Sequence, residues 1–261
     1  MTGELDGRTA LVTGAAGAIG KGVAAELARR GAAVFLTDLL ADPLGAAVVE
    51  VAAAGSAAGQ TADVTDEESV RACVAAAHEA LGGRIDVLVN VAGIVAQGRV
   101  EEIEVADWEK IFAVNCRGTF LFCKHCVPGM KQAGYGKIVN FSSKSGKTGS
   151  ALMSHYSAAK AAVIGFTQAL AYELADHRIN VNCVCPGITD HTGVWSHVSA
   201  GYIENLGKSR EEVIKQFTAK IPLKRLASIA DVVAVTCFLC SPGSDYMTGQ
   251  AINITGGREM H

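Results

Sequence analysis

Short apolar segments alternate with longer segments of helical periodicity along most of the chain. The apolar runs predict strands, and the amphipathic or alanine-rich segments between them predict helices. The predicted strands are 9–13, 33–37, 57–62, 85–90, 137–141, 179–185 and 250–254. The predicted helices are 21–30, 43–54, 66–81, 105–132, 154–175 and 229–239. This alternation is typical of a parallel sheet covered by helices on both faces.

We therefore predict a single α/β domain over residues 1–261, with a Rossmann-like, doubly wound parallel sheet of about seven strands. The alternation stops between residues 190 and 225, where Trp195, Tyr202 and an amphipathic stretch at 209–219 occur. A segment of this size beside the ligand-binding edge of a sheet predicts a small lid.

Composition narrows the class of protein. With 261 residues and 49% hydrophobic content, the chain can bury a large core. The net charge of -3 and the lack of a Lys/Arg block disfavour nucleic acid and anionic membranes as partners. The N-terminus is polar and no apolar run is long enough to span a bilayer, so we expect a cytoplasmic protein that binds a small molecule or another subunit.

Eight cysteines are scattered through predicted strands and helices, which favours free thiols in a reducing compartment. Cys123 and Cys126 form a C-x-x-C pair inside a predicted helix. No second pair completes a metal site, so we expect these cysteines to pack in the core or at an interface. No metal is predicted.

The first strand leads into a glycine-rich loop, Gly14 to Gly20, followed by a helix. Exposed N–H groups at a helix start, together with the helix dipole, can hold a pyrophosphate, although an ordinary tight turn explains the loop equally well by itself. The second strand ends at Asp38, where a carboxylate can accept from both ribose hydroxyls. Such a carboxylate repels a 2'-phosphate, and positions 15, 16, 39 and 40 carry no Lys or Arg. We therefore predict NAD rather than NADP.

Further polar or small residues follow other strands at the carboxyl edge of the predicted sheet, where ligands bind in open α/β sheets. They occupy 63–64, 90–93 and 186–189, and any one of them could merely cap or turn. Asn115 lies in the middle of the long helix 105–132. A solvated or back-bonding side chain is the ordinary interpretation of such an Asn.

Tyr156 and Lys160 lie at positions i and i+4 of a predicted helix, on one face and within reach of each other. A lysine ammonium beside a tyrosine favours the phenolate, which can take the proton of an alcohol. The alternative is one buried ring and one solvated charge. Ser142 and Ser143 end the preceding strand at the same edge.

These motifs, in order and at their spacing, resemble the classical short-chain dehydrogenase/reductase family along nearly the whole chain. The matching residues are Thr13-Gly14 through Gly20, Asp63, Asn90 to Gly93, Asn115, Ser143, Tyr156, Lys160 and Pro186-Gly187. The resemblance implies hydride transfer between a secondary alcohol carbon and a nicotinamide ring.

By this resemblance Tyr156 is the acid/base and Ser143 holds the substrate oxygen. Lys160 binds the nicotinamide ribose and lowers the pKa of Tyr156, and Asn115 completes a proton relay through water. Ser143 lies thirteen residues before Tyr156, the family's interval, so it is preferred to Ser142.

The resemblance also implies pyrophosphate contacts at the glycine loop, adenine contacts after the third strand, ribose contacts after the second and fourth, and carboxamide contacts after the sixth. The implied NAD-binding residues are Gly14, Gly17, Ile19, Gly20, Asp38, Asp63, Val64, Asn90, Ala92, Gly93, Tyr156, Lys160, Pro186, Gly187, Ile188 and Thr189. Two positions depart from the family pattern: Ala18 replaces its middle glycine and Val91 its second asparagine. The Ala18 methyl is expected to shift the loop slightly or weaken binding, not to abolish it.

Segments 143–150, 244–250 and 255–257 resemble the polyol and diol branch of the family, and the first is similar to the loop of sorbitol-6-phosphate 2-dehydrogenases. We therefore predict an NAD-dependent dehydrogenase of a sugar alcohol or diol, with Ser143, Ser145 and Tyr156 contacting the substrate. The alternatives are a sugar-alcohol-phosphate dehydrogenase, a 3-ketoacyl or steroid ketoreductase, and a non-catalytic NAD-binding regulatory protein.

Lys144 and Lys147 could bind a substrate phosphate, but lysines on such a loop are more often solvated, which favours a neutral polyol. The resemblance further implies a homotetramer, or a homodimer. The long apolar helices near Cys123 and Phe166 are the candidate interfaces.

Overall fold

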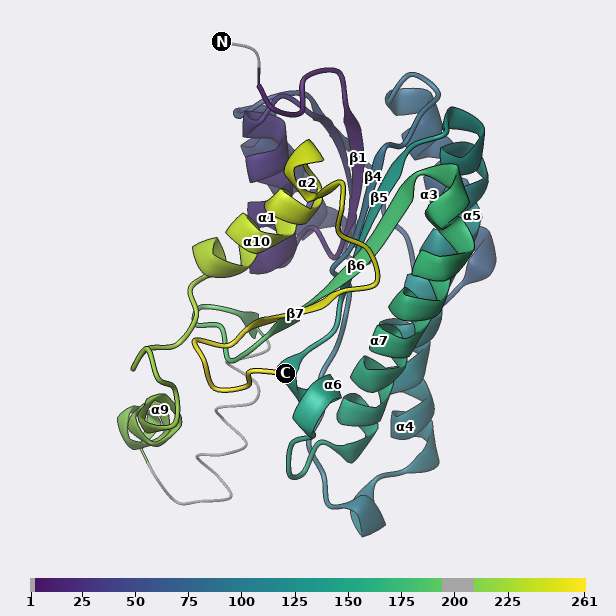
Figure 1. The fold of residues 1–261 in the computed structure, drawn as a ribbon. Coiled ribbons are helices and arrows are strands. Elements are labelled where there is room, and N and C mark those ends of the chain that lie inside the picture. Colours follow the sequence, from purple (N-terminus) through teal and green to yellow (C-terminus); the bar gives the residue numbers. More distant parts are fainter. Residues whose placement is uncertain (1–2, 194–208) are drawn as a thin grey trace.

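The computed structural model describes residues 3–193 and 209–261. These residues form one seven-stranded sheet in the order β3-β2-β1-β4-β5-β6-β7, with every neighbouring pair parallel (Figure 1). The strands are β1 (Thr9–Thr13), β2 (Ala33–Thr37), β3 (Ala57–Gly59), β4 (Val87–Asn90), β5 (Gly136–Phe141), β6 (Ile179–Pro186) and β7 (Ala251–Ile254). The predicted doubly wound α/β sheet is confirmed.

The strand order reverses direction between β1 and β4. From β1 the chain moves outward through β2 and β3, and then returns to place β4 on the other side of β1. Connections therefore leave the carboxyl ends of β1 and β4 in opposite directions, which opens a crevice between them where ligands bind in such sheets. Both strands are buried on both faces, which explains their continuous apolar runs.

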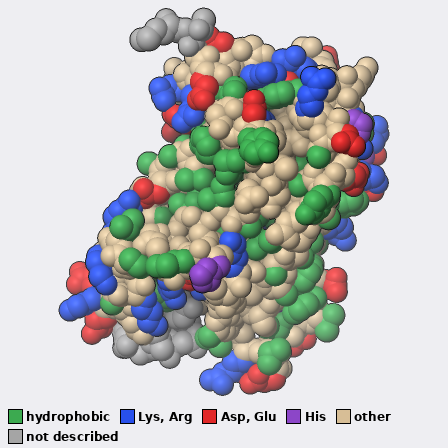
Figure 2. Space-filling view, in the orientation of Figure 1, with side chains coloured by type: hydrophobic (Ala, Val, Ile, Leu, Met, Phe, Trp, Pro, Cys, Tyr) green, Lys and Arg blue, Asp and Glu red, His purple; other side chains and the backbone are tan. Residues whose placement is uncertain are grey.

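Helices cover the two faces as separate layers (Figure 1). The helices are α1 (Ala18–Arg29), α2 (Ala41–Ala52), α3 (Glu67–Ala80), α4 (Val105–Phe112), α5 (Gly118–Ala133), α6 (Lys144–Thr148), α7 (Ser154–Leu174), α9 (Arg210–Ala219) and α10 (Ile229–Leu239). One core cluster joins α1, α2 and α10 to the sheet, and a second joins α3, α5 and α7 to its other face. Hydrophobic side chains also extend across the middle of one outer face, with charges of both signs toward its ends (Figure 2).

Three predicted elements differ in the structure. The helix expected over 105–132 is divided into α4 and α5 by a π-helical turn at Ala113–Arg117. The third strand is shorter than 57–62, because only Ala57–Gly59 pairs with β2. Residues 144–148, expected as loop, form α6, whose first turn is capped by Ser143.

The segment predicted as a lid lies partly outside the described residues, and both Trp195 and Tyr202 belong to the omitted part. Its amphipathic stretch is confirmed as α9, which a capping box between Ser209 and Glu212 starts. Figure 1 draws α9 apart from the two helical layers. Its function as a lid stays a prediction.

The cysteines of the C-x-x-C pair face the core. Cys123 and Cys126 are buried in the cluster that packs α5 against the sheet. Core packing of these two cysteines is therefore confirmed, and the expected interface on the long helices near Cys123 and Phe166 stays a prediction. Within the described residues, no helix combines the length and hydropathy needed to cross a bilayer.

Candidate active site

The four predicted catalytic residues come from three elements and meet beyond the carboxyl end of β5. Ser143 follows β5, Tyr156 and Lys160 lie in the first two turns of α7, and Asn115 lies in the π-helical turn. Asn115 and Lys160 both lie next to Gly93, because a Cβ atom on this glycine would lie 2.7 Å from Asn115 Oδ1 and 3.2 Å from Lys160 Nζ. The Lys160 ammonium lies 5.7 Å from the centre of the Tyr156 ring.

Asn115 is completely buried, so the interpretation as a solvated side chain is wrong. Its amide donates to the carbonyl of Ile111, which is the back-bonding alternative, and also to the carbonyl of Ile94 at 2.9 Å. Its Oδ1 has no hydrogen-bond partner among residues 3–193 and 209–261, and it faces the space beside Gly93 and Lys160. A buried oxygen left open in this way can accept from a water or a ligand.

Burial controls the titration of both residues on α7. It raises the pKa of Tyr156 to about 12, and a hydrogen bond with Ser143 acts in the opposite direction. Burial lowers the pKa of Lys160 to about 8, while its ammonium donates to the carbonyl of Phe141 at 2.8 Å. The implied lowering of the Tyr156 pKa by Lys160 is absent from this structure, because desolvation of the phenolate dominates.

The glycine loop between β1 and α1 leaves a helix start open. Gly14 has a φ of +62°, and a Cβ atom there would lie 2.7 Å from the backbone nitrogen of Ala92. A Cβ atom on Gly20 would lie 2.2 Å from the carbonyl oxygen of Gly14. Both positions therefore require glycine, whereas Ala18 is the first residue of α1. No side chain caps this helix, so its first N–H groups, including that of Ile19, suit a pyrophosphate.

Asp38 lies beside this loop, at the carboxyl end of β2, as predicted. Its carboxylate accepts from the backbone N–H of Ala16 at 3.0 Å and from that of Leu39 at 2.8 Å. These two bonds fix the carboxylate on the ligand edge of the sheet. Within the described part of the chain it forms no ion pair with a lysine or arginine.

Other predicted cofactor residues have structural contacts of their own. Asp63 Oδ1 accepts from the N–H and the hydroxyl of Thr65, which is a turn contact. Asn90 is buried and its amide donates to Asn140 Oδ1 at 2.9 Å, across to β5. The N–H of Ala92 donates to the Thr13 hydroxyl. These contacts place the residues at the expected edge, and their contacts with a nucleotide stay predictions.

The segment after β6 is held in place by residues distant in the sequence. Gly187 N–H donates to the carbonyl of Ile254, and Ala227 N–H donates to the carbonyl of Ile188. Thr189 forms a parallel bridge with Ala227. The backbone of Pro186 to Thr189 is therefore held in place at the carboxyl edge. At another point of this edge, beyond β3, Val64 packs against Gly118. The predicted carboxamide and adenine contacts are not tested by this geometry.

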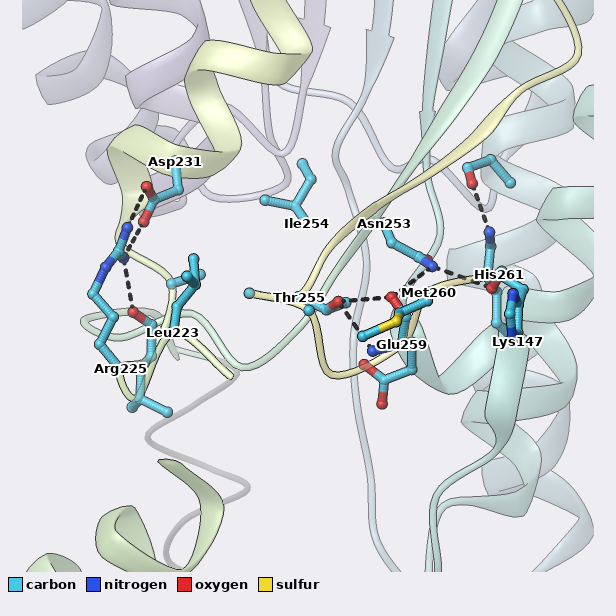
Figure 3. Close-up of a pocket in the computed structure, with 15 residues that line it drawn as sticks. Lys147, Leu223, Arg225, Asp231, Asn253, Ile254, Thr255, Glu259, Met260 and His261 are labelled. Atoms are coloured by element: carbon cyan, nitrogen blue, oxygen red, sulfur yellow. Dashed lines mark hydrogen bonds and ion pairs between the residues drawn. The ribbon is translucent and has the colours of Figure 1, made fainter. Parts of the chain in front are cut away.

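Ser145 and the two lysines of α6 do not simply face water. Ser145 is buried, and its hydroxyl lies 2.9 Å from that of Ser150. The Lys147 ammonium donates to the carbonyl of Ala251 at 2.6 Å, so the prediction of a solvated side chain is wrong there (Figure 3). Lys144 is half-buried and donates to Gly149 O at 3.3 Å.

A pocket of about 650 Å³ lies beside α6, bordered by Lys147, Leu223, residues 225–227 and the C-terminal tail (Figure 3). Asn253 holds the tail by donating to the carbonyls of Glu259 and His261. Tyr156 is not among the residues that line this pocket. Sequence reasoning did not connect the tail with α6, and no local signal could have done so, since they are about a hundred residues apart.

Comparisons with known proteins cover almost the entire chain. A family model described as Enoyl-(Acyl carrier protein) reductase matches residues 14–259. A sorbitol dehydrogenase from Cereibacter sphaeroides is 36% identical over 258 residues, which are 98% of this chain and 99% of the relative.

Two solved structures have the same fold. An NAD⁺-bound xylitol dehydrogenase has a TM-score of 0.93 and 31% identity, with 97% of this chain and 99% of the other covered. An actinorhodin polyketide ketoreductase with NADPH has a TM-score of 0.94 and 35% identity, with both chains covered completely. With the family model matched from the glycine loop to the tail, and with relatives this similar over their full length, the chain belongs to the short-chain dehydrogenase/reductase family of oxidoreductases.

Proposed function

We propose that this protein is an NAD-dependent dehydrogenase that interconverts a secondary alcohol, a sugar alcohol or diol, and its ketone. One observation carries the proposal: Ser143, Tyr156, Lys160 and Asn115 are buried together at the sheet edge onto which the uncapped start of α1 also opens. A protein that only bound the nucleotide would not need this proton-transfer set. The similarity to a sorbitol dehydrogenase supports the polyol class, whereas the similarity to a ketoreductase supports the alternative.

The mechanism follows from what each side chain can do. A bound nicotinamide cofactor supplies the hydride acceptor. The Ser143 hydroxyl binds the substrate oxygen, and Tyr156 takes its proton as general base. The Lys160 ammonium, held by the Phe141 carbonyl, would bind the nicotinamide ribose, and the open Asn115 Oδ1 accepts from a water on the path by which the proton leaves. Burial of all four residues strengthens these interactions by excluding bulk water.

Asp38 supports the choice of NAD. Its carboxylate is fixed by two N–H groups and has no described cation beside it to neutralise a 2'-phosphate. The two solved structures bind different cofactors, so the preference rests on this residue.

The test compares NAD and NADP in the oxidation of sorbitol, galactitol and 2,3-butanediol, followed as absorbance of the reduced cofactor. We expect kcat/KM to be about 10- to 100-fold higher with NAD, from like-charge repulsion worth about 1–3 kcal/mol. The Asp38→Ala substitution should remove most of this preference. Equal rates with NADP would contradict the cofactor assignment, and turnover of ketones alone would favour a ketoreductase. Absence of turnover with every alcohol and ketone would favour a regulatory NAD-binding protein.

A sugar-alcohol phosphate is the second candidate substrate, because Lys144 lies beside other cations. Burial lowers the pKa of Lys144, and the nearby Arg258 lowers it further, while Glu259 acts in the opposite direction. Lys144 and Arg258 border one small pocket together with Gly187. If a phosphate binds there, kcat/KM for sorbitol 6-phosphate should exceed that for sorbitol and should fall selectively in Lys144→Met. If the ratio of kcat/KM for sorbitol 6-phosphate to that for sorbitol is the same in wild type and in Lys144→Met, the neutral polyol remains the proposed substrate.

We also propose a homotetramer, with the outer face of α5 and α7 as one interface. Phe120 on α5 and Phe166 on α7 contact each other edge to face, with ring centres 6.3 Å apart, and Phe120 is 44% exposed. A pair of one exposed and one partly buried aromatic ring on two long helices fits a partner helix pair. The cytoplasmic location stays a prediction of the sequence.

A further inference from the structure

The short helix α6 lies between two parts of the active site: Ser143, which caps it, and α7, which carries Tyr156 and Lys160. Ser143, immediately before α6, accepts the N–H of Ser145 on its hydroxyl oxygen at 3.1 Å. An oxygen that already accepts a bond in this way leaves its own proton free to be donated. The bond between Ser143 and Tyr156 lowers the pKa of the phenol, as expected when a hydroxyl donates to the phenolate.

A chain of serines continues from this point back to α7. The hydroxyl of Ser145 lies 2.9 Å from that of Ser150, just beyond Gly149, which ends α6 with a φ of +69°. The N–H of Ser150 then donates to the hydroxyl of Ser157 at 3.2 Å. Ser157 is the residue after Tyr156, so the serine chain begins beside the substrate-binding hydroxyl and ends beside the base.

Close packing leaves α6 little freedom. A Cβ atom on Gly146 would lie 2.7 Å from the carbonyl carbon of Lys160, so the backbone of α6 lies directly against that of α7. The Ser142 hydroxyl also donates to the Lys160 carbonyl at 2.7 Å. The contact between the Ser145 and Ser150 hydroxyls is a further restraint on α6.

We propose that Ser145 and Ser150 are positioning residues, which hold α6 so that the Ser143 hydroxyl stays beside Tyr156 and the substrate oxygen. The inference rests on the proposed dehydrogenase function. It gives the buried Ser145 hydroxyl an internal partner in place of the direct substrate contact expected from the sequence. Loss of either hydroxyl leaves the other without its partner and lets α6 rotate, which misdirects Ser143 without removing it.

The test uses Ser145→Ala, Ser150→Ala and the double variant, assayed with the best alcohol and NAD. Each single variant should lower kcat about tenfold and leave the KM for NAD unchanged, as expected for a lost hydrogen bond that acts through geometry. The double variant should lose no more than either single one, because both remove the same interaction. The apparent pKa in the kcat–pH profile should rise, and Ser150→Thr should restore most of kcat.

Thr148→Ala is the matched control, since Thr148 is an exposed hydroxyl residue of α6 that bonds only to Lys144 O among the described residues. It should behave as wild type. If thermal denaturation shows that Ser150→Ala does not fold, Ser157→Ala, which removes the acceptor of Ser150 N–H, replaces it and should lower kcat in the same way.

Two results would overturn the inference. One is a raised alcohol KM in Ser145→Ala with wild-type behaviour in Ser150→Ala, which is the pattern of direct substrate contact. The other is unchanged kcat and pH profile in all variants.

If the wild-type protein turns over no alcohol or ketone, the proposed function fails. Hydrogen exchange at the Ser145 amide then decides the inference: faster exchange in Ser150→Ala than in Thr148→Ala supports the positioning chain, and equal exchange rejects it.

Discussion

At the scale of single residues, desolvation dominates the chemistry of the site. Tyr156 and Lys160 are nearly inaccessible, and burial moves their pKa values toward the neutral forms, up for the phenol and down for the ammonium. Donation from Ser143 opposes this shift for the phenol. A base that works near neutral pH therefore needs further stabilisation of its phenolate by the bound cofactor and substrate.

Replacing Tyr156 by Phe tests the assigned base. We expect Tyr156→Phe to lower kcat by about 10²- to 10⁴-fold, the usual contribution of a general base, because the buried ring keeps its packing and loses only the hydroxyl. NAD affinity, measured by fluorescence titration, should stay within a few-fold of wild type. Substantial residual turnover would show that another group takes the proton.

Lys160 is predicted to cost stability. Below about pH 8 it is protonated both in the folded and in the unfolded chain, so the full penalty of burying the charge is present. Between pH 8 and its ordinary pKa of 10.5, the unfolded chain holds more protons, so stability rises with pH. After allowing for the lost bond to Phe141, Lys160→Met should raise the free energy of unfolding at pH 7 by about 1–2 kcal/mol. This gain should vanish near pH 10.5, as urea denaturation at several pH values can measure.

Lys137 is the matched control, because it is a buried lysine that has a carboxylate partner. Its ammonium lies 2.6 Å from Asp245 and 2.8 Å from Asn180 Oδ1. Lys137→Met should therefore destabilise the protein, by about 1–3 kcal/mol at pH 7. A Lys160→Met protein less stable than wild type at pH 7 would refute the desolvation argument.

At the scale of elements, three short structures shape the site: the glycine loop, the π-helical turn and α6. The π-helical turn holds Asn115 against the loop that follows β4, where Ile94 O accepts its amide. Local sequence favours a simple helix over 105–132, and the contact of Asn115 with this loop lies at the interruption. In the same way, α6 is stabilised by its N-cap, Ser143, and by packing on α7 rather than by five residues of helix propensity.

Gly20 tests the glycine loop. A Cβ atom at this position would lie 2.2 Å from the Gly14 carbonyl oxygen, which is backbone and cannot move aside cheaply. Gly20→Ala should destabilise the fold by about 1–3 kcal/mol and weaken NAD binding at least tenfold, since the loop must open. Gly45→Ala on α2, where a Cβ atom meets nothing within 4 Å, is the control and should stabilise slightly. Calorimetry measures both effects, and wild-type affinity in Gly20→Ala would contradict the tight loop.

At the scale of the whole molecule, the parallel sheet brings every chemical motif to one edge, and its outer helices carry the predicted contacts with other subunits. Phe120→Glu should lower the molar mass measured by light scattering, because it places a charge in the aromatic pair on α5 and α7. Val49→Glu, which alters a side chain 74% exposed on α2, is the control and should not change the mass. An unchanged mass in Phe120→Glu would move the interface elsewhere.

The sequence by itself determined the order of the seven strands along the chain, the doubly wound sheet and the positions of Asp38, Ser143, Tyr156 and Lys160. Each of these depends on local patterns: runs of apolar residues for strands, helical spacing, and polar residues just beyond strand ends. Tertiary structure decided how these side chains are used. Burial sets the pKa values of Tyr156 and Lys160, and distant backbone groups bind Asn115 and Lys147. Desolvation and contacts between remote segments arise only when the chain is packed, so no local pattern could report them.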